Sequence, residues 1–167
     1  MDEKSLKILT TVHPILKEKI LRVYASVSAT LELTMRPTSG LRSIEEQRRI
    51  WVMGRDPDGK VFDPKLVRTK TPPGSSWHNY GLAIDSCFDG SDPYFEQLEK
   101  RNEKEYNRRW MVFGRACSDE GLEWGGNFPS IRDMNHAQLR FGFQMKQVQA
   151  LYKEGGIEAV WAKMILA

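Results

Sequence analysis

Residues 75–88 of the chain, SSWHNYGLAIDSCF, contain the strand from which the fold is most readily predicted. From Gly81 to Phe88, Leu82 and Ile84 point to one face of the predicted strand, and Ala83, Asp85 and Cys87 point to the other, because successive side chains alternate along a strand. His78 stands shortly before this strand. The segment therefore predicts a largely apolar strand that carries polar side chains at its entrance and on one face.

Two further segments have the same period of two. In His136–Phe141 the apolar residues Ala137, Leu139 and Phe141 alternate with polar ones, and residues 31–36 alternate leucine and methionine with polar side chains. Strands and helices do not alternate regularly along the chain, which favours an α+β fold with a small antiparallel sheet flanked by helices.

Apolar residues at helical spacing predict the helices. The sequence Pro37-Thr38-Ser39-Gly40 is typical of a turn, and Ser43 and Glu46 form a capping box for a helix that runs to about Met53. Residues 54–76 show no periodicity and predict a long loop. Further helices are expected after His13-Pro14, through Trp110 and Phe113 to about Gly121, from Met145 to a stop at Gly155-Gly156, and from Ile157 to Met164.

Composition limits the class of protein. The 167 residues, 40% of them hydrophobic, are enough for one well-buried core, so we expect a single domain over residues 1–167. The net charge of +3 comes with no block of basic residues, so we expect no nucleic-acid partner. No stretch approaches the about 20 apolar residues that span a bilayer, and the N-terminus has no signal-peptide core.

The two cysteines, Cys87 and Cys117, allow at most one disulfide. Cys117 continues the apolar stripe of Tyr106, Trp110 and Phe113, which predicts a buried free thiol. The acidic loop at residues 89–92, DGSD, leaves room for a calcium ion.

His78, Asp85 and His136 are candidate ligands for one zinc ion. Catalytic zinc typically has three nitrogen or oxygen ligands from the protein and a fourth position for water, whereas structural zinc is usually closed by four ligands rich in cysteine. Each histidine alone also fits a hydrogen-bonded structural residue, which is the interpretation we keep for His13.

Asp133 and Arg42 are candidates for catalysis. Asp133 precedes His136 by three residues and could accept a proton from a zinc-bound water, although a simple turn residue fits its position equally well. Arg42 lies at a strand-to-helix junction and could hold a carbonyl or carboxylate, or form a surface ion pair. Trp51 and Trp124 could line a groove, whereas Trp161 fits the apolar stripe of its helix.

Four segments taken together resemble, in order, the motifs of the D-alanyl-D-alanine carboxypeptidase-like zinc peptidases. The most similar branch is the L-alanyl-D-glutamate endopeptidases of phage endolysins and bacterial autolysins, and the resemblance covers roughly residues 10–165. The segments are GLRSIEEQ (40–47), SSWHNYGLAID (75–85), EWGGNF (123–128) and DMNHAQ (133–138).

The resemblance implies the α+β fold shared with the hedgehog signalling domain and one zinc ion held by His78, Asp85 and His136. It further implies Asp133 as the general base and Arg42 as the residue that steadies the substrate carbonyl. Aspartate at position 133, where carboxypeptidase branches carry glutamate, selects the endopeptidase branch. Ser76 and Gln47 match motif positions near the substrate, Gln47 in a supporting role, and Glu123 is a reserve candidate for the base.

The function implied by the resemblance is cleavage of the L-Ala to D-Glu bond in the peptidoglycan stem peptide. The alternatives are a D-Ala carboxypeptidase of the same fold and a zinc-containing cell-wall binding module without catalysis. Asp133 argues against the pure binding module. We expect a monomer that is made in the cytoplasm and acts at the peptidoglycan, as a phage or bacterial enzyme.

Overall fold

The computed structural model of the chain describes residues 1–129 and 131–165. The chain forms two compact units: unit 1 comprises Met1–Gly40 and Leu82–Arg140, and unit 2 comprises Leu41–Gly81 and Phe141–Ala167. Unit 2 contains α3 (Ile44–Trp51), the 3₁₀ helix η1 (Trp77–Tyr80) and α6 (Met145–Ile165). Unit 1 contains α1 (Glu3–Thr10), α2 (Pro14–Leu31), β1 (Met35–Ser39), β2 (Ala83–Phe88), α4 (Glu96–Arg101), α5 (Glu103–Asp119), β3 (Glu123–Trp124), the 3₁₀ helix η2 (Gly125–Asn127) and β4 (His136–Gln138).

The sheet of unit 1 has four strands in the order β1-β2-β4-β3. Every pair of neighbours is antiparallel. The central strand β2 is the one predicted from residues 81–88, and β4 is a shorter version of the strand predicted from His136 onward. The predicted α+β class with a small antiparallel sheet is confirmed.

The strand predicted at residues 31–36 was wrong in its position. Helix α2 continues to Leu31 and ends at Glu32, which adopts the left-handed conformation with φ 56°, and β1 begins only at Met35. Val23, Val27 and Leu31 are four residues apart, so helical spacing extended across the short alternating segment. The predicted turn at residues 37–40 is instead mostly strand, because β1 lies at the sheet edge, where Pro37 is tolerated beside a register shift.

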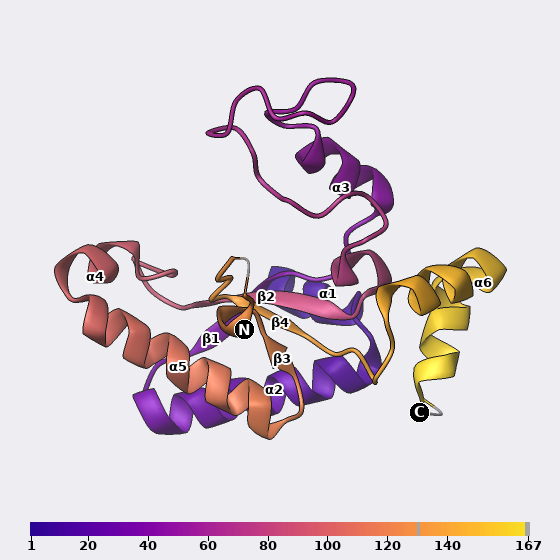
Figure 1. The fold of residues 1–167 in the computed structure, drawn as a ribbon. Coiled ribbons are helices and arrows are strands. Elements are labelled where there is room, and N and C mark those ends of the chain that lie inside the picture. Colours follow the sequence, from indigo (N-terminus) through magenta and orange to yellow (C-terminus); the bar gives the residue numbers. More distant parts are fainter. Residues whose placement is uncertain (130, 166–167) are drawn as a thin grey trace. The chain divides into compact units, whose positions relative to one another are not determined.

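The core of unit 1 lies where α2 and α5 pack side by side (Figure 1). Apart from the half-buried Tyr106, the apolar residues that predicted α2 and α5 are buried, and Phe88 of β2 packs edge-on against Trp110 with ring centroids 5.1 Å apart. Each fully buried side chain of this size contributes about 1.5–3 kcal/mol to folding. These residues are Leu16, Ile20, Val23 and Val27 of α2 and Trp110, Phe113 and Cys117 of α5.

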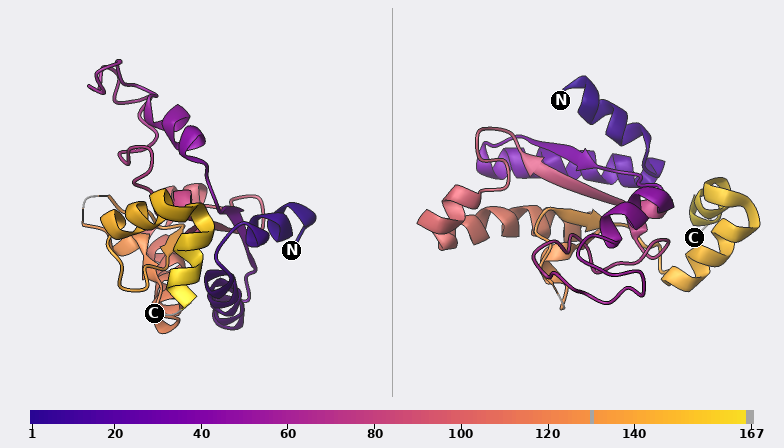
Figure 2. Two further views of the ribbon diagram at one scale, coloured as in Figure 1. Left: turned by 90° about the vertical axis from the view of Figure 1, so that its right-hand side faces the viewer. Right: turned by 90° about the horizontal axis from the view of Figure 1, so that it is seen from above.

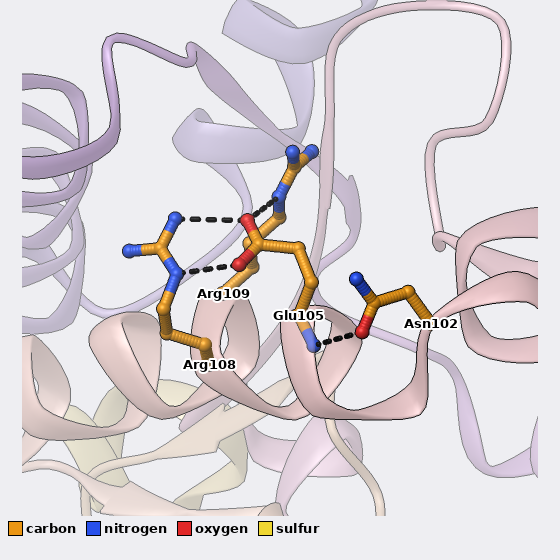
Figure 3. A network of polar contacts seen from close by, with 4 residues as sticks. All are labelled: Asn102, Glu105, Arg108 and Arg109. Carbon is orange, nitrogen blue, oxygen red and sulfur yellow. Dashed lines mark hydrogen bonds and ion pairs between the residues drawn. The ribbon is translucent and has the colours of Figure 1, made fainter.

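Helix α5 begins with a polar network (Figure 3). The Oδ1 atom of Asn102 accepts a hydrogen bond from the backbone N–H of Glu105 at 3.1 Å, and the Glu105 carboxylate binds Arg108 and Arg109 one turn later. Hydrogen bonds from these two guanidinium groups lower the pKa of Glu105 to about 2. The cap separates α5 from the short helix α4, so the charged segment before Trp110 forms two helices.

Unit 2 confirms the predicted capping box and the predicted helix stop. Ser43 and Glu46 exchange both capping-box hydrogen bonds at the start of α3. At Gly155-Gly156 the backbone leaves the helical conformation, and the bend divides α6 into the two predicted segments (Figure 2). Gly156 has φ 70° and ψ −158°, a conformation that only glycine adopts readily.

Two aromatic residues of α6, one in each segment, tie this helix to η1 within unit 2. Tyr80 packs edge-on against Tyr152, and the half-buried Trp161 donates its indole N–H to the carbonyl of Tyr80 at 2.8 Å. Residues 54–76, between α3 and η1, form the long loop that was predicted. Their one regular pairing is an isolated bridge between Arg55 and Val61. This arrangement fixes η1, which carries His78, inside its unit.

Both cysteines are free and buried, as predicted for Cys117. Burial raises the pKa of the Cys117 thiol, so it remains protonated and unreactive. Among the described residues, no helix has both the length and the apolar character needed to cross a membrane.

Candidate metal and catalytic site

Asp85 and His136 face each other across two paired strands of unit 1. The register of β2 and β4 places Asp85 opposite His136, and the Oδ1 atom of Asp85 lies 3.0 Å from Nδ1 of His136. His136 is 8% exposed, so the pair is shielded from most of the solvent. Antiparallel pairing thus brings together two residues that are 51 positions apart in the sequence.

This pair fits a metal centre. Two ligand atoms on a tetrahedral zinc ion, each about 2.0–2.1 Å from it, lie roughly 3.3 Å apart. The separation of 3.0 Å between Asp85 Oδ1 and His136 Nδ1 is close to that value. An imidazole and a carboxylate are also ordinary ligands for zinc, so both the donor chemistry and the spacing are suitable.

The electrostatic surroundings of His136 are anionic. Burial by itself would lower the pKa of His136, but the hydrogen bond and charge of Asp85, the hydrogen bond to Gln138 and the charge of Asp133 together raise it. A site that stabilises positive charge on an imidazole also attracts a cation that takes the place of the proton. The contribution of Asp133 puts its carboxylate within electrostatic reach of His136.

The backbone fixes Asp133 next to His136 inside unit 1. The backbone N–H of Asp133 donates to the carbonyl of Gly125 at 3.0 Å, and the carbonyl of Asp133 accepts from the backbone N–H of His136 at 3.2 Å. A side chain at Gly125 would be built 2.5 Å from the Asp133 carbonyl oxygen and 3.0 Å from the Cβ atom of His136. Only glycine permits this close approach, so the EWGG segment shapes the site.

Unit 2 holds Arg42 next to His78. The backbone N–H of Arg42 donates to the carbonyl of His78 at 3.0 Å. Asn79, which is 3% exposed, donates its amide to the carbonyls of Arg42 at 2.9 Å and Ser43 at 3.4 Å. Its Oδ1 atom accepts from the N–H groups of Gly74 and Ser76. One buried amide therefore connects the Arg42 segment to the segment that carries Ser76 and His78.

Gln47 is fully buried in unit 2 and contacts the Arg42 side chain. Its Oε1 atom accepts from Nη1 of Arg42 at 3.0 Å, and its Nε2 atom donates to the carbonyl of Thr71 at 2.8 Å. Both ends of the Gln47 amide are thus bonded within the protein. This geometry is that of a support for Arg42.

The predicted site residues are divided between the units. Among the described residues, His78, Asp85 and His136 offer the ligand chemistry of a metal site. His78 belongs to unit 2, as do Arg42, Gln47 and Ser76, whereas Asp85, Asp133 and His136 belong to unit 1. The chain passes directly from η1 to β2, so only six residues separate His78 from Asp85.

Two residues of the site were missed by the sequence analysis. Asn79 lies inside the motif SSWHNY, but its role depends on carbonyls more than 30 residues away. The Oε1 atom of Gln138 lies 3.0 Å from Nε2 of His136, and its Nε2 atom donates to Oε2 of Glu123 at 2.9 Å. The alternation that places His136 and Gln138 on one strand face could have identified it.

Other candidates from the sequence are occupied by structural contacts. Asp89 binds Thr34 and Arg36, and the Oδ2 atom of Asp92 accepts from two backbone N–H groups of α4. These bonds use carboxylate oxygens that a calcium ion would need. Trp124 is 4% exposed and donates its indole N–H to the carbonyl of Met134, so most of it packs in the core of unit 1. Its remaining surface lines a shallow pocket together with Leu122 and Phe128.

Residues 69–139 match a protein-family model described as D-alanyl-D-alanine carboxypeptidase. The matched range contains Asp85, Asp133 and His136 as well as His78. The match covers less than half of the chain and shows that this part is similar to the family. The chain is 26% identical over 137 residues to the peptidoglycan L-alanyl-D-glutamate endopeptidase CwlK of Bacillus subtilis, covering 81% of this chain and 78% of the relative.

Two solved peptidase structures have a similar fold. The L-Ala D-Glu endopeptidase ChiX of Serratia marcescens matches with a TM-score of 0.50 and 22% identity, over 84% of this chain and 90% of that chain. The vancomycin-resistance D,D-dipeptidase VanXYg, solved with a D-Ala-D-Ala phosphinate analogue, matches with a TM-score of 0.50 and 21% identity, over 91% of this chain and 59% of that chain. These likenesses support the fold predicted from the sequence.

Proposed function

We propose that this peptidase is a zinc-dependent peptidoglycan hydrolase that cleaves the bond between L-Ala and D-Glu in the stem peptide. The observation that carries the proposal is the buried pair of Asp85 and His136, 3.0 Å apart, with Asp133 fixed beside it. The similarity to CwlK, an L-alanyl-D-glutamate endopeptidase, supports this bond as the substrate.

In this proposal one zinc ion is held by His78, Asp85 and His136, within a single catalytic domain formed by residues 1–167. Two imidazoles and a carboxylate leave one coordination position for water or substrate. When bound, zinc supplies a water molecule of lowered pKa and polarises the scissile carbonyl.

Asp133 acts as the general base in the proposed reaction. Its carboxylate accepts the proton of the attacking water and delivers it to the leaving amine of D-Glu. The hydrogen bonds between the Asp133 backbone, Gly125 and His136 keep this carboxylate in place during the transfer.

Arg42 binds the substrate in the proposed reaction. Its guanidinium group donates hydrogen bonds to the carbonyl oxygen as negative charge develops there. Gln47 holds the guanidinium through Oε1, and Ser76, at the start of η1, contributes to the peptide-binding surface.

A D-Ala carboxypeptidase is the second candidate, because the matched family model carries that description. Such an enzyme would bind the free carboxylate of the terminal D-Ala, and Arg42 could serve that purpose as well. Aspartate at position 133 favours the endopeptidase by the resemblance described above.

The test is mass spectrometry of the products released from purified peptidoglycan, with and without a zinc chelator and after zinc is restored. Zinc-dependent release of peptides that begin at D-Glu is expected. Release of free D-Ala would instead identify a carboxypeptidase. Zinc binding without any product would identify a cell-wall binding module.

The proposed place of action is the peptidoglycan layer, as a monomeric phage endolysin or bacterial autolysin. Sedimentation of the purified protein tests the monomer, and lysis of chloroform-permeabilised cells tests the lytic role. A stable dimer would contradict the proposed monomer. Cells that stay intact although purified peptidoglycan is cleaved would contradict the proposed lytic role.

A further inference from the structure

A chain of polar contacts within unit 1 leads from the protein surface to His136. Arg140 forms an ion pair with Glu123, whose Oε1 atom lies 3.3 Å from Nη1 of the arginine. Glu123 Oε2 accepts from Nε2 of Gln138 at 2.9 Å, and Gln138 Oε1 lies 3.0 Å from Nε2 of His136. The register of β3 and β4, which pairs Glu123 with Gln138, places these groups side by side.

The chemistry of these groups fixes which atom donates and which accepts in each of these hydrogen bonds. An ionised carboxylate only accepts hydrogen bonds, so Glu123 must face the NH₂ end of the Gln138 amide. The carbonyl end of that amide then faces His136, and because a carbonyl also only accepts, Nε2 of His136 must carry a proton. Nδ1 lies 3.0 Å from the Asp85 carboxylate, which also only accepts, so without a metal Nδ1 is held protonated as well. A metal ion in the proposed site would take the place of the Nδ1 proton and use the lone pair of that atom, while the remaining proton on Nε2 faces Gln138.

We propose that Gln138, oriented by Glu123, is a positioning residue that fixes the tautomer of His136 and presents Nδ1 to the metal. The proposal rests on the zinc site proposed above. Partners of this kind orient a histidine ligand and strengthen its binding, and their loss typically lowers metal affinity or activity by about 10–100-fold.

The burial of Gln138 supports this role. Gln138 is 5% exposed, and both ends of its amide are bonded to side chains, which leaves little surface for a substrate. Glu123 is at the exposed end of this series of polar contacts, with 47% of its side chain accessible and Arg140 beside it. A change at Glu123 therefore alters the orientation of the amide without opening the core.

The test compares Gln138→Met and Glu123→Gln with the parent protein. Methionine fills the same space but cannot accept the proton of Nε2, so zinc affinity is expected to fall by about 10–100-fold. Glutamine at position 123 can either donate or accept, so Gln138 loses its fixed orientation and a smaller loss of several-fold is expected. Zinc affinity is measured by competition with a chromogenic chelator.

The tautomer of His136 is measured directly by ¹⁵N NMR at saturating zinc, because without a metal the Asp85 carboxylate competes for the ring proton through Nδ1. The parent protein is expected to show Nε2 protonated, and both variants a mixture of tautomers. If Gln138 served packing alone, its replacement would leave the tautomer of His136 unchanged. The double variant Gln138→Glu/Glu123→Gln exchanges the two groups. The carboxylate at position 138 then accepts from Nε2 of His136, and the amide at position 123 donates to that carboxylate, so the single tautomer is expected to return.

Glu120→Gln is the matched control, because it removes another carboxylate of unit 1 that pairs with an arginine, Arg22, away from the site. Its zinc affinity and tautomer should equal those of the parent. Zinc affinities within twofold of the parent in both variants, with an unchanged tautomer, would overturn the proposal. If Gln138→Met does not fold, Glu123→Gln and the reversed pair decide the question.

These readouts separate the positioning role from the proposed function. If zinc and tautomer respond as expected but peptidoglycan is not cleaved, the positioning role stands and the proposed function fails. If the parent does not bind zinc, the proposed zinc site and the positioning role both fail. If zinc binds and peptidoglycan is cleaved but both variants keep the zinc affinity and tautomer of the parent, only the positioning role fails.

Discussion

The two units hold their functional side chains in different ways. In unit 1, Asp85 and His136 are placed by backbone pairing of β2 and β4, and Glu123 and Gln138 by pairing of β3 and β4. In unit 2, Arg42 lies beside His78 through one backbone bond and the Asn79 amide. Backbone pairing survives most side-chain substitutions, whereas an arrangement built on one buried amide is lost when that amide is removed.

The largest effect is expected from His136→Ala in unit 1. This change removes a proposed ligand, so zinc affinity should fall by more than about 100-fold, and activity should be lost with it. Loss of a residue that only hydrogen-bonds to a ligand typically costs about 10–100-fold. Zinc content after dialysis and peptidoglycan turnover measure the two effects.

His13→Ala is the matched control, because it alters another buried histidine of unit 1 whose Nδ1 atom caps α2. It should cost about 2–5 kcal/mol of stability, because a buried ring and a helix cap are both lost, and leave zinc stoichiometry unchanged. A His136→Ala protein with full zinc content would exclude His136 as a ligand.

The next largest effect is expected from Asp133→Asn, which keeps the backbone bonds of Asp133 but removes the base. Zinc should be retained, and kcat should fall by about 10²–10⁴-fold because general-base catalysis is lost. Steady-state kinetics on a stem peptide measures the change, with Asp119→Asn on the exposed end of α5 as a control. Full activity would show that another group is the base, with Glu123 the first to test.

Asn79→Ala tests the amide that organises unit 2. It removes four hydrogen bonds and leaves buried carbonyl and N–H groups unpaired, so the free energy of unfolding should fall by about 1–3 kcal/mol. Urea denaturation measures stability, and KM for a stem peptide should rise because Arg42 is displaced. Gln144→Ala, an exposed amide of unit 2, should change neither quantity. Unchanged stability in Asn79→Ala would mean that backbone contacts alone hold Arg42.

The smallest effect is expected from Glu105→Gln, at the start of α5. Glu105 lies at the surface with 26% of its side chain exposed, and its ion pairs are within one helix, so the melting temperature should fall by only about 1–2 °C at neutral pH. Because the folded-state pKa of Glu105 is lowered to about 2, its contribution is complete above the usual value of 4.5 and is lost as pH falls toward 2. Thermal unfolding between pH 2 and pH 7 tests this sign. A difference between parent and variant that grew toward low pH would contradict it.

Local patterns predicted the elements with strong signals of their own. The capping box of Ser43 and Glu46, the helix stop at Gly155-Gly156 and the strand around Asp85 all occur where the sequence indicated. The strand predicted at residues 31–36 was wrong, since a short alternating segment competes poorly with an established helix that gains one hydrogen bond per added residue. The two-residue strand β3 carries too little sequence to show a period.

The sequence by itself determined the chemistry that this protein has available: two histidines and two aspartates in family motifs, an arginine before a capped helix, and an α+β order of elements. Only the tertiary structure decided which of these groups meet. The pairing of β2 with β4 brings Asp85 to His136, and the amides of Gln138 and Asn79 acquire roles because their partners are distant in the sequence. The physical reason is that periodicity reports which face of an element is buried, whereas a hydrogen-bond partner is defined only after the elements have packed.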